Sequence, residues 1–485
     1  MISSYMVFIP LRLHPAGPTD GCLDEAVLEG IVLIYWVGVL TIHILLFAPI
    51  SVDAEEVYGP PNAPHSISST QDKEGGGKVP TTELIDDPAH PAEHALKSLP
   101  TKSDYTIIPL PAFASNPNEG YWVGMNPPIL KADSKGEVKE VLMPQYLYNR
   151  LIGQYGSLNY FAYPSDTEQY HALAWFGQKL DQGIDLGYKN LNAGGYIFAA
   201  DFAAFKDPFE RFFGFGSRTT QTQETNYTSR ELLVKLTAGI KLTPDLALML
   251  IERYRNVRVD AGIVDSLPAT AQQFSTIPGI QGAQVLGHGL TLRYDTRNSQ
   301  LMPTKGTYVN LLAEFNQNVQ PHEENQWWHV AFDARQFIPH SSDRMTFVAR
   351  LLITCVFGQT ERKGAEQLGV PFYEQPTLGG ENTLRAFGRG RYVGSWAALV
   401  NLEERVTVLN KTMFDINTHL EIAPFLDIGR VGQNSAKALQ GSLKDLQINP
   451  GIGFRLLIKP TVVARFDVAY GRDGENVFVG IDYPY

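Results

Sequence analysis

Hydrophobic and polar residues alternate along most of the chain, in runs of about ten residues that turn residues separate. The run Val462–Gly471 is typical, because its apolar side chains take every second position while Arg465 and Asp467 fall on the other face. Successive side chains of a strand point to opposite faces, so this pattern predicts strands that are apolar on one side. Three further clear examples are Tyr308–Phe315, Ile452–Lys459 and Val477–Tyr485. No long amphipathic helix interrupts the pattern, which predicts an all-β fold.

A soluble sandwich and a membrane barrel would both alternate in this way, and the aromatic residues favour the barrel. Aromatics lie near the predicted strand ends, as in the girdles at the two interfaces of a membrane barrel. They are Tyr121, Trp122, Trp327, Trp328, Trp396, Tyr470, Tyr483 and Tyr485. A closed barrel is the only sheet that can cross lipid, since it leaves no unpaired edge. At roughly 24 residues per strand and connection, we predict a transmembrane antiparallel β-barrel of about 16 strands over Asp104–Tyr485.

The N-terminal segment contains an uncharged apolar stretch, Gly30–Ile50, followed by Ser51-Val-Asp-Ala54. The small residues before Glu55 fit a signal-peptidase site, so residues 1–54 are interpreted as a signal peptide. Acidic residues precede the stretch, which is atypical of a signal peptide and would be explained if the true start lies downstream of Met1. The alternative is a transmembrane anchor, because the stretch is long enough to span a bilayer as a helix.

The next segment, Glu55–Ser103, is polar, rich in Pro, Gly and Asp, and shows no periodicity. This composition predicts a disordered periplasmic arm. The arm contains His90-Pro-Ala-Glu-His94, which matches the H-x-x-E-H pattern of some zinc proteases. That chemistry needs both histidines on one face of a stable helix, and Pro91 lies between them, so we expect no metal site there.

Charge and composition exclude several function classes. The formal net charge of −11 argues against nucleic-acid binding. Two cysteines, Cys22 and Cys355, make neither a disulfide framework nor a metal cluster. The chain has no G-x-S-x-G motif and its histidines are scattered, so no enzyme, metal or cofactor is predicted.

A long Gly-rich segment, Gly358–Ser395, separates two predicted strands, and loops of this length are usually functional or disordered. Its centre holds Arg385 beside Phe387. Glycines that permit a positive φ flank this centre: Gly379, Gly380, Gly388 and Gly390. Downstream, strand alternation places Asp427 and Glu421 on the lumenal face of one strand, and Asn401, Glu403 and Arg405 on the lumenal face of another. Glu404 then falls on the apolar side, which suits only a position at the membrane interface.

Several motifs together resemble the barrel of the BamA-type bacterial surface-antigen superfamily, which includes outer-membrane assembly factors and two-partner secretion transporters. Leu384-Arg385-Ala386-Phe387 is similar to the family's V/I-R-G-F/Y loop motif, with Leu for Val and Ala for Gly. Phe425-Leu-Asp427-Ile-Gly429 matches its F-x-D-x-G strand motif fully. Further matches are Asp295-Thr-Arg297 with Pro303-Thr-Lys-Gly306, Phe213-Gly214-Phe215-Gly216, and the terminal aromatic Tyr485.

The resemblance implies that the long loop folds into the lumen and that Arg385 pairs with Asp427, with Glu403 as a second acceptor. A bidentate pair of Arg with carboxylate is strong and charge-assisted. On the residues alone, Asp427 could instead satisfy a neighbouring lumenal arginine, Arg455 or Arg465.

The resemblance also implies a function at the outer membrane of a Gram-negative-type cell. Family members usually carry POTRA domains before the barrel, and only the arm precedes it here, so a barrel-only member is expected. The expected role is to aid insertion or translocation of polypeptide or lipid, and the alternative is a passive pore or structural barrel. Expected partners are the lipid bilayer, outer-membrane or secreted polypeptide clients, and a separate periplasmic recognition protein. Pro484 cannot donate a ladder hydrogen bond, so it loosens the seam between first and last strands or ends the last one.

Overall fold

A computed structural model describes residues 105–485, apart from 108–110, 117–119, 134–137, 166, 180, 321–324, 341–343, 359–361, 364–365, 368, 414–415, 434–444, 459–461 and 482. The predicted signal peptide, the polar arm and the H-x-x-E-H sequence lie outside the described residues. Among the described residues, no helix is both long and apolar enough to cross a membrane.

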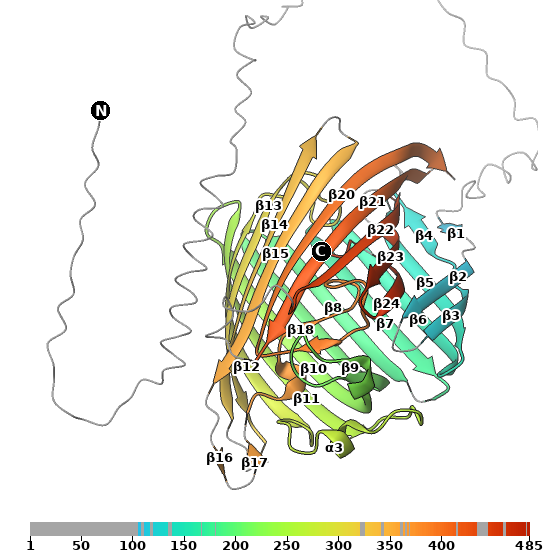
Figure 1. Ribbon diagram of the computed structural model, residues 1–485. Coiled ribbons are helices and arrows are strands. Elements are labelled where there is room, and N and C mark those ends of the chain that lie inside the picture. The colour runs from blue at the N-terminus through green and yellow to red at the C-terminus, as the bar shows by residue number, and fades with distance from the viewer. Residues whose placement is uncertain are drawn as a thin grey trace, which may run out of the picture. The chain divides into compact units, whose positions relative to one another are not determined.

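The described residues form almost entirely strands (Figure 1). One large sheet contains β1 (Tyr105–Ile107), β2 (Pro111–Asn116), β3 (Gly120–Met125), β4 (Ile129–Ala132), β5 (Val138–Asn149), β6 (Gly153–Ser165), β7 (Glu168–Gly177), β8 (Gln182–Ala193), β9 (Tyr196–Phe212), β10 (Thr225–Lys241), β11 (Leu246–Ala261), β12 (Ala283–Asp295), β13 (Gly306–Asn318), β14 (Gln326–His340), β15 (Met345–Gly358), β20 (Trp396–Met413), β21 (Ile416–Gly432), β22 (Gln447–Ile458), β23 (Val462–Gly471) and β24 (Gly474–Ile481).

The remaining elements are short and lie in connections. They are η1 (Gln221–Gln223), α3 (Thr270–Gln273), η2 (Phe372–Glu374), the paired β16 (Arg362–Lys363) and β17 (Glu366–Gln367), and the paired β18 (Thr377–Leu378) and β19 (Tyr392–Val393).

The predicted all-β antiparallel barrel class is confirmed, but the sheet has 20 strands rather than about 16. Part of the difference arises because two strands are interrupted and are therefore counted twice. β3 and β4 both pair with β5 and together occupy one strand position. β1 pairs with β4 and β2 pairs with β3, so β1 and β2 together occupy the next position. The rest arises from connections shorter than the assumed spacing. Only Gly194 and Gly195, for example, separate β8 from β9.

The two ends of the sheet meet at a seam between β2 and β24. Among the described residues, one pair, Ser115 with Val477, joins them, whereas eight pairs join β24 to its other neighbour, β23. The sheet therefore curves until its ends are neighbours without closing a full ladder. The strand predicted to run to Tyr485 ends at Ile481, before Pro484.

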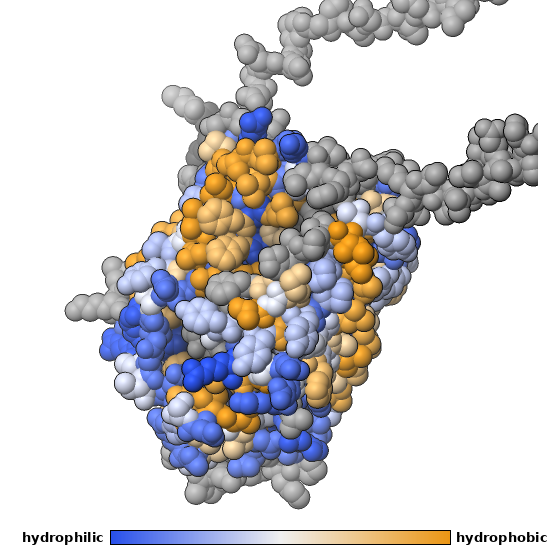
Figure 2. Space-filling view, turned by 90° about the vertical axis from the view of Figure 1, so that its right-hand side faces the viewer, coloured by the Kyte–Doolittle hydropathy of each residue, from blue (hydrophilic) through white to orange (hydrophobic). Residues whose placement is uncertain are grey.

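The faces of the sheet follow the alternation in the sequence. Outward side chains are apolar and exposed, as Leu236 (54%) and Leu250 (62%) illustrate, while inward positions carry buried polar groups such as Asn401 and Arg455. Figure 2 shows apolar surface in broad patches over the wall, with hydrophilic surface gathered mainly toward the lower end.

The aromatic girdle is only partly as predicted. Tyr121, Trp328 and Tyr470 are exposed on the outside. Trp122, Trp327, Trp396 and Tyr485 are instead buried. For Tyr121–Trp122 and Trp327–Trp328 the reason is strand geometry, because consecutive side chains point to opposite faces and only one ring of each pair can face outward.

The long loop between β15 and β20 folds into the lumen, as predicted. Its Leu384, Phe387 and Tyr392 are buried in one cluster with Leu399 of β20 and Phe425 of β21. The loop therefore fills part of the barrel interior instead of extending from its rim.

Candidate functional site

The inserted loop is a tight hairpin in which β18 pairs with β19. Gly379 and Gly380 begin its tip with φ of 117° and 101°. At Gly379 a Cβ atom would lie 2.4 Å from the carbonyl oxygen of Gly388, so only glycine fits there. Gly390 also has a positive φ of 71°, whereas Gly388 does not. The glycines thus let the two arms of the hairpin approach closely around Arg385.

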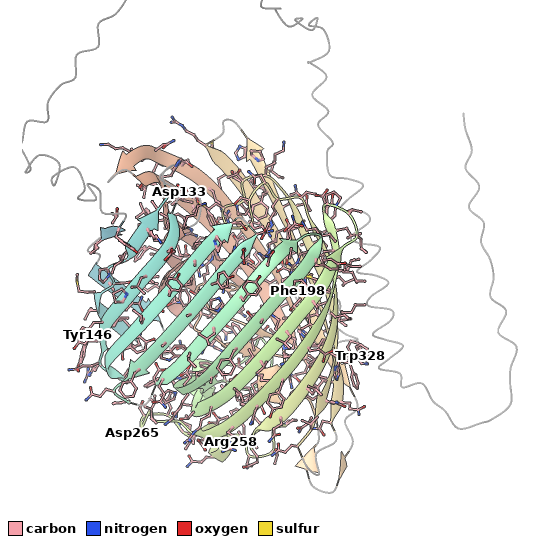
Figure 3. The ribbon with its side chains drawn as sticks, turned by 180° about the vertical axis from the view of Figure 1, so that it is seen from behind. Asp133, Tyr146, Phe198, Arg258, Asp265 and Trp328 are labelled. Atoms are coloured by element: carbon pink, nitrogen blue, oxygen red, sulfur yellow. The ribbon has the colours of Figure 1, made fainter. Side chains whose placement is uncertain are left out.

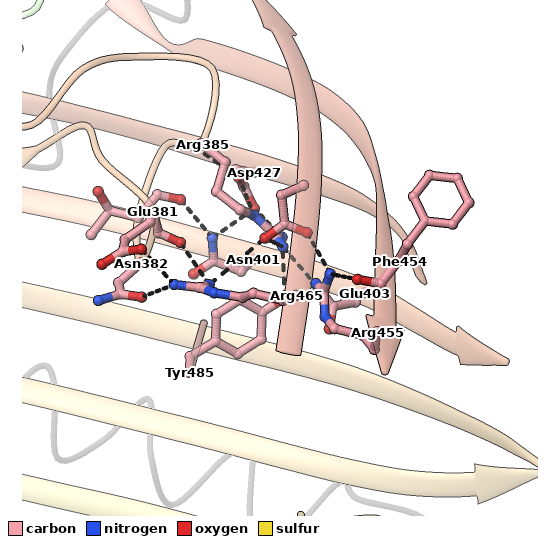
Figure 4. A network of polar contacts seen from close by, with 12 residues as sticks. Glu381, Asn382, Arg385, Asn401, Glu403, Asp427, Phe454, Arg455, Arg465 and Tyr485 are labelled. Carbon is pink, nitrogen blue, oxygen red and sulfur yellow. Dashed lines mark hydrogen bonds and ion pairs between the residues drawn. The ribbon is translucent and has the colours of Figure 1, made fainter. Parts of the chain in front are cut away.

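Arg385 binds Asp427 of β21 through both arms of its guanidinium group (Figure 4). Its Nε donates to Asp427 Oδ2 at 3.0 Å, and its Nη2 donates to Oδ1 at 2.9 Å. The backbone N–H of Arg385 donates to the same carboxylate at 3.1 Å. Both side chains are fully buried. This is the bidentate, desolvated arrangement that makes an Arg–carboxylate pair strong.

A second carboxylate completes the contact. Arg385 Nη1 donates to Glu403 Oε2 at 2.8 Å, and the ring of Phe425 stacks against the guanidinium carbon at 3.3 Å from the ring centroid. Burial disfavours the charged form of Arg385, but Asp427, Tyr485 and Glu403 outweigh it, so the pKa of the guanidinium lies well above its ordinary value. Arg385 is therefore held as a cation.

The surrounding network balances its charges. It contains four arginines and four carboxylates, namely Arg385, Arg405, Arg455 and Arg465 with Glu381, Glu403, Asp427 and Asp467. The alternative partners weighed for Asp427 bind elsewhere, because Arg455 contacts Asp467 and Glu403, and Arg465 contacts Glu381. Burying charged groups is costly unless opposite charges offset one another, and the equal numbers meet that need.

All three positions of the F-x-D-x-G strand motif contact the loop. Phe425 stacks on Arg385 and Asp427 binds it. At Gly429 a Cβ atom would come within 2.9 Å of the Leu378 side chain. The motif spacing follows from the strand period of two, since every second residue faces the lumen.

The neighbours of Arg385 in the loop are core residues. Leu384, Ala386 and Phe387 are each at most 2% exposed. Ala386 stands where the similar motif has glycine, and its methyl group fits because residue 471 is Gly. A Cβ at Gly471 would lie 2.7 Å from that methyl carbon. Asn476 of β24 donates to the carbonyl oxygen of Arg385 at 3.1 Å, which links the last strand to the loop.

The remaining motifs also reach the lumenal assembly. The ring of Phe213 lies 4.3 Å from the guanidinium carbon of Arg391, and Gly216 donates to Val393 of β19 at 2.8 Å. In the β12–β13 connection, Arg297 makes a bidentate pair with Asp295: its Nε donates to Oδ1 at 2.9 Å and its Nη2 donates to Oδ2 at 2.8 Å. The carbonyl oxygen of Pro303 accepts from Arg405. Motifs far apart in the sequence thus meet around one loop.

A second anchor, which the sequence patterns did not indicate, holds the loop to a different part of the wall. Glu374 of η2 accepts from Arg253 at 2.9 and 3.2 Å and from Arg255 at 2.9 Å, both on β11. Its side chain is 5% exposed. Burial raises the pKa of Glu374, but Arg255 and Arg253 outweigh burial and lower it below its ordinary value. The loop therefore crosses the lumen between β11 and the β20–β23 wall.

Two further arginines of the loop bind other connections. Arg391 donates to Asp473 at 2.5 Å and to the Thr219 hydroxyl at 3.0 Å. Arg389 contacts Asp207 and Glu210 of β9 at 2.9 and 2.7 Å, with its own side chain 67% exposed. The sequence patterns did not indicate these contacts.

The chain terminus lies inside the barrel. The Tyr485 hydroxyl is 3.5 Å from Arg385 Nη2, and its ring packs with Phe337 and Val348. Tyr485 is therefore part of the lumenal assembly, and not of the last strand, Val477–Tyr485, in which alternation placed it together with Pro484. Glu404, on the apolar side, pairs with His340 at 2.8 Å.

The described residues include no group of three or more His, Cys, Asp or Glu side chains that could hold a metal ion. The carboxylates of the network around Arg385 are bound by arginines, and the lumenal Glu421 accepts from the Tyr483 hydroxyl.

A family model described as the Omp85 superfamily domain matches residues 156–478, which is more than half of the 485 residues. No curated protein matches the chain. Among solved structures, the chain is similar to BamA from Haemophilus ducreyi lacking POTRA domains 1-3, with 13% identity, a TM-score of 0.45, and coverage of 77% of this chain and 74% of that chain. It is also similar to CdiB from Acinetobacter baumannii, with 11% identity, a TM-score of 0.41, and coverage of 79% and 60%. Both TM-scores are below 0.5 and add no weight to the family match.

Proposed function

The chain belongs to the Omp85 superfamily, and we propose that it is an outer-membrane barrel that inserts or translocates polypeptide or lipid, with the Arg385 loop as an internal lock. The proposal rests mainly on the buried hydrogen bonds that the Arg385 guanidinium group donates to the carboxylates of Asp427 and Glu403. A loop of this length loses much conformational entropy when it is pinned, and a single exposed ion pair, typically ~0.2–1 kcal/mol, would not hold it.

Two features distinguish this proposal from a passive pore. A pore needs an open lumen, whereas here the loop is bound to two separate parts of the wall, to β11 through Glu374 and to β21 through Arg385. An insertase needs a seam that opens, and in the described part of the chain one residue pair, Ser115 with Val477, joins β2 to β24. Few ladder hydrogen bonds have to break before that seam can separate.

The experiment is reconstitution of the purified protein into liposomes, with an unfolded outer-membrane polypeptide as client. Client insertion is followed by heat-modifiable mobility, and ion conductance is recorded on the same preparation. A matched variant carries Ser115→Cys and Val477→Cys, which a disulfide closes across the seam.

The proposal predicts faster insertion than in empty liposomes, low resting conductance, and loss of insertion in the oxidised variant that reductant restores. Steady conductance without client insertion would identify a passive pore instead. The Arg218→Ala variant is the control, because Arg218 is 78% exposed and its one ion pair with a described residue is with Asp445, away from Arg385 and its partners.

A further inference from the structure

A row of three cations crosses the outer face of the sheet on neighbouring strands. Lys206 of β9 lies opposite Arg230 of β10, and Arg230 lies opposite Arg258 of β11. Directly opposed residues of an antiparallel pair share a face. Arg230 and Arg258 are exposed, and the same face continues with the exposed apolar Phe202 and Leu236. Figure 3 shows this wall, with Arg258 and Phe198 labelled toward its opposite ends.

Only the middle cation of the row has an ion-pair partner within the described part of the chain. Arg230 Nε lies 2.8 Å from Asp260 Oδ2, with both side chains about half exposed. Neither Lys206 nor Arg258 forms an ion pair with a described residue. Like charges directly opposite one another destabilise a sheet. Two unneutralised cations flanking a third therefore form a site that an anion would stabilise.

The position of the row matches one edge of an apolar band. Next to the three cations lies a parallel row of apolar side chains, Ile184, Ala204 and Leu232. These side chains line a groove together with the three cations. Lys206 and the exposed Tyr196 are ten residues apart on β9, about 33 Å along a strand. A strand tilt of about 40° reduces this to about 25 Å, which is the usual height of the lipid-facing band. The cations thus sit at headgroup level.

The connections at this end are the long ones. They include residues 213–224 between β9 and β10 and residues 262–282 between β11 and β12, whereas Gly194–Gly195 and residues 242–245 join the same strands at the other end. Barrels of outer membranes place long loops outside the cell and short turns in the periplasm. The row therefore faces the outer leaflet.

We propose that Lys206, Arg230 and Arg258 bind the phosphate groups of an anionic lipid of the outer leaflet. The acyl chains of that lipid lie in the groove over Ile184, Ala204 and Leu232. Arg and Lys are suited to phosphate because they offer charge-assisted hydrogen bonds, bidentate ones from Arg. The proposal rests on the outer-membrane location given above and is independent of insertion activity.

The test compares the purified barrel with the variant K206Q/R230Q/R258Q in neutral detergent. Each is titrated with a doubly phosphorylated glycolipid (lipid A), with the same glycolipid after removal of its phosphates, and with inorganic phosphate, and bound molecules are counted by native mass spectrometry. At about 1 kcal/mol per basic residue near a charged surface, loss of the two unpaired cations should weaken binding of the phosphorylated lipid roughly 30-fold.

A control variant removes three exposed cations outside the row, R218Q/K305Q/K411Q, and should bind the phosphorylated lipid as the wild type does. Without lipid, the row variant should unfold at the same or a higher temperature, because like-charge repulsion is gone. That result also shows that it folds. Equal binding of phosphorylated and dephosphorylated lipid, unchanged binding by the row variant, or binding of inorganic phosphate alone would overturn the proposal.

Discussion

Replacing Arg385 with Ala should release the inserted loop. The change removes three guanidinium hydrogen bonds to buried carboxylates, two to Asp427 and one to Glu403. The network then holds three arginines against four acids. Breaking a buried pair from one side costs about 3–5 kcal/mol. We expect the lower end of this range, because Asp427 keeps Asn401 as a donor and Glu403 keeps two arginines.

A loss of about 3 kcal/mol corresponds to an increase of roughly 100-fold in the open population of the loop. Hydrogen exchange of the amides between Gly379 and Gly390 reports this population directly, and limited proteolysis supports it. Arg385→Lys should be intermediate, since it retains the charge but cannot fork onto a carboxylate. Arg218→Ala should leave loop exchange unchanged, because Arg218 is an exposed surface residue.

A double-mutant cycle with Asp427→Ala tests whether the two residues act as a unit. Each single change leaves one uncompensated charge in the lumen, whereas the double variant restores neutrality. Loop protection in the double variant should therefore be no worse than in the worse single variant. Strictly additive effects on exchange would refute a joint role, and unchanged exchange in Arg385→Ala would refute the lock itself.

The remaining predictions concern packing, pH and processing. Gly471→Ala should destabilise the loop by about 1–3 kcal/mol through a clash with Ala386, measured as faster loop exchange, and Ala386→Gly in the same chain should relieve part of the loss. Glu374 has a folded pKa below its ordinary value of 4.5, so its stabilisation is present above pH 4.5 and is lost as the pH falls through the lower folded pKa. Proteolysis of the loop should increase in that acid range, and Glu374→Gln should remove this part of the pH dependence; an identical pH profile in the variant would exclude the anchor. N-terminal sequencing of protein extracted from membranes should begin at or near Glu55, and retention of the preceding residues would indicate an anchor.

Much of the fold could be predicted because successive side chains of a strand point to opposite faces, so apolar and polar residues alternate with a period of two. Alternation located β23 at Val462–Gly471 to the residue and placed Asp427 and Glu403 on the lumenal face, where both contact Arg385. The strand count was too low because connections such as Gly194–Gly195 are shorter than an average spacing assumes.

Contacts across the lumen could not be predicted from the same pattern. Glu374 and Arg253 are 121 positions apart. Alternation assigns Arg253 of β11 to a face without identifying its partner, and it says nothing of Glu374, which lies in the loop and not in a strand. The inward turn of Tyr485 was missed for a related reason. After β24 ends at Ile481, strand parity no longer governs which way a side chain points.

The most direct test of the central claim is client insertion by the Arg385→Ala variant in liposomes, measured beside loop exchange on the same sample. If the pinned loop is a working part of an insertion or translocation barrel, the variant should show both a released loop and clearly slower insertion than the wild type and Arg218→Ala. A released loop with insertion at the wild-type rate would contradict the account.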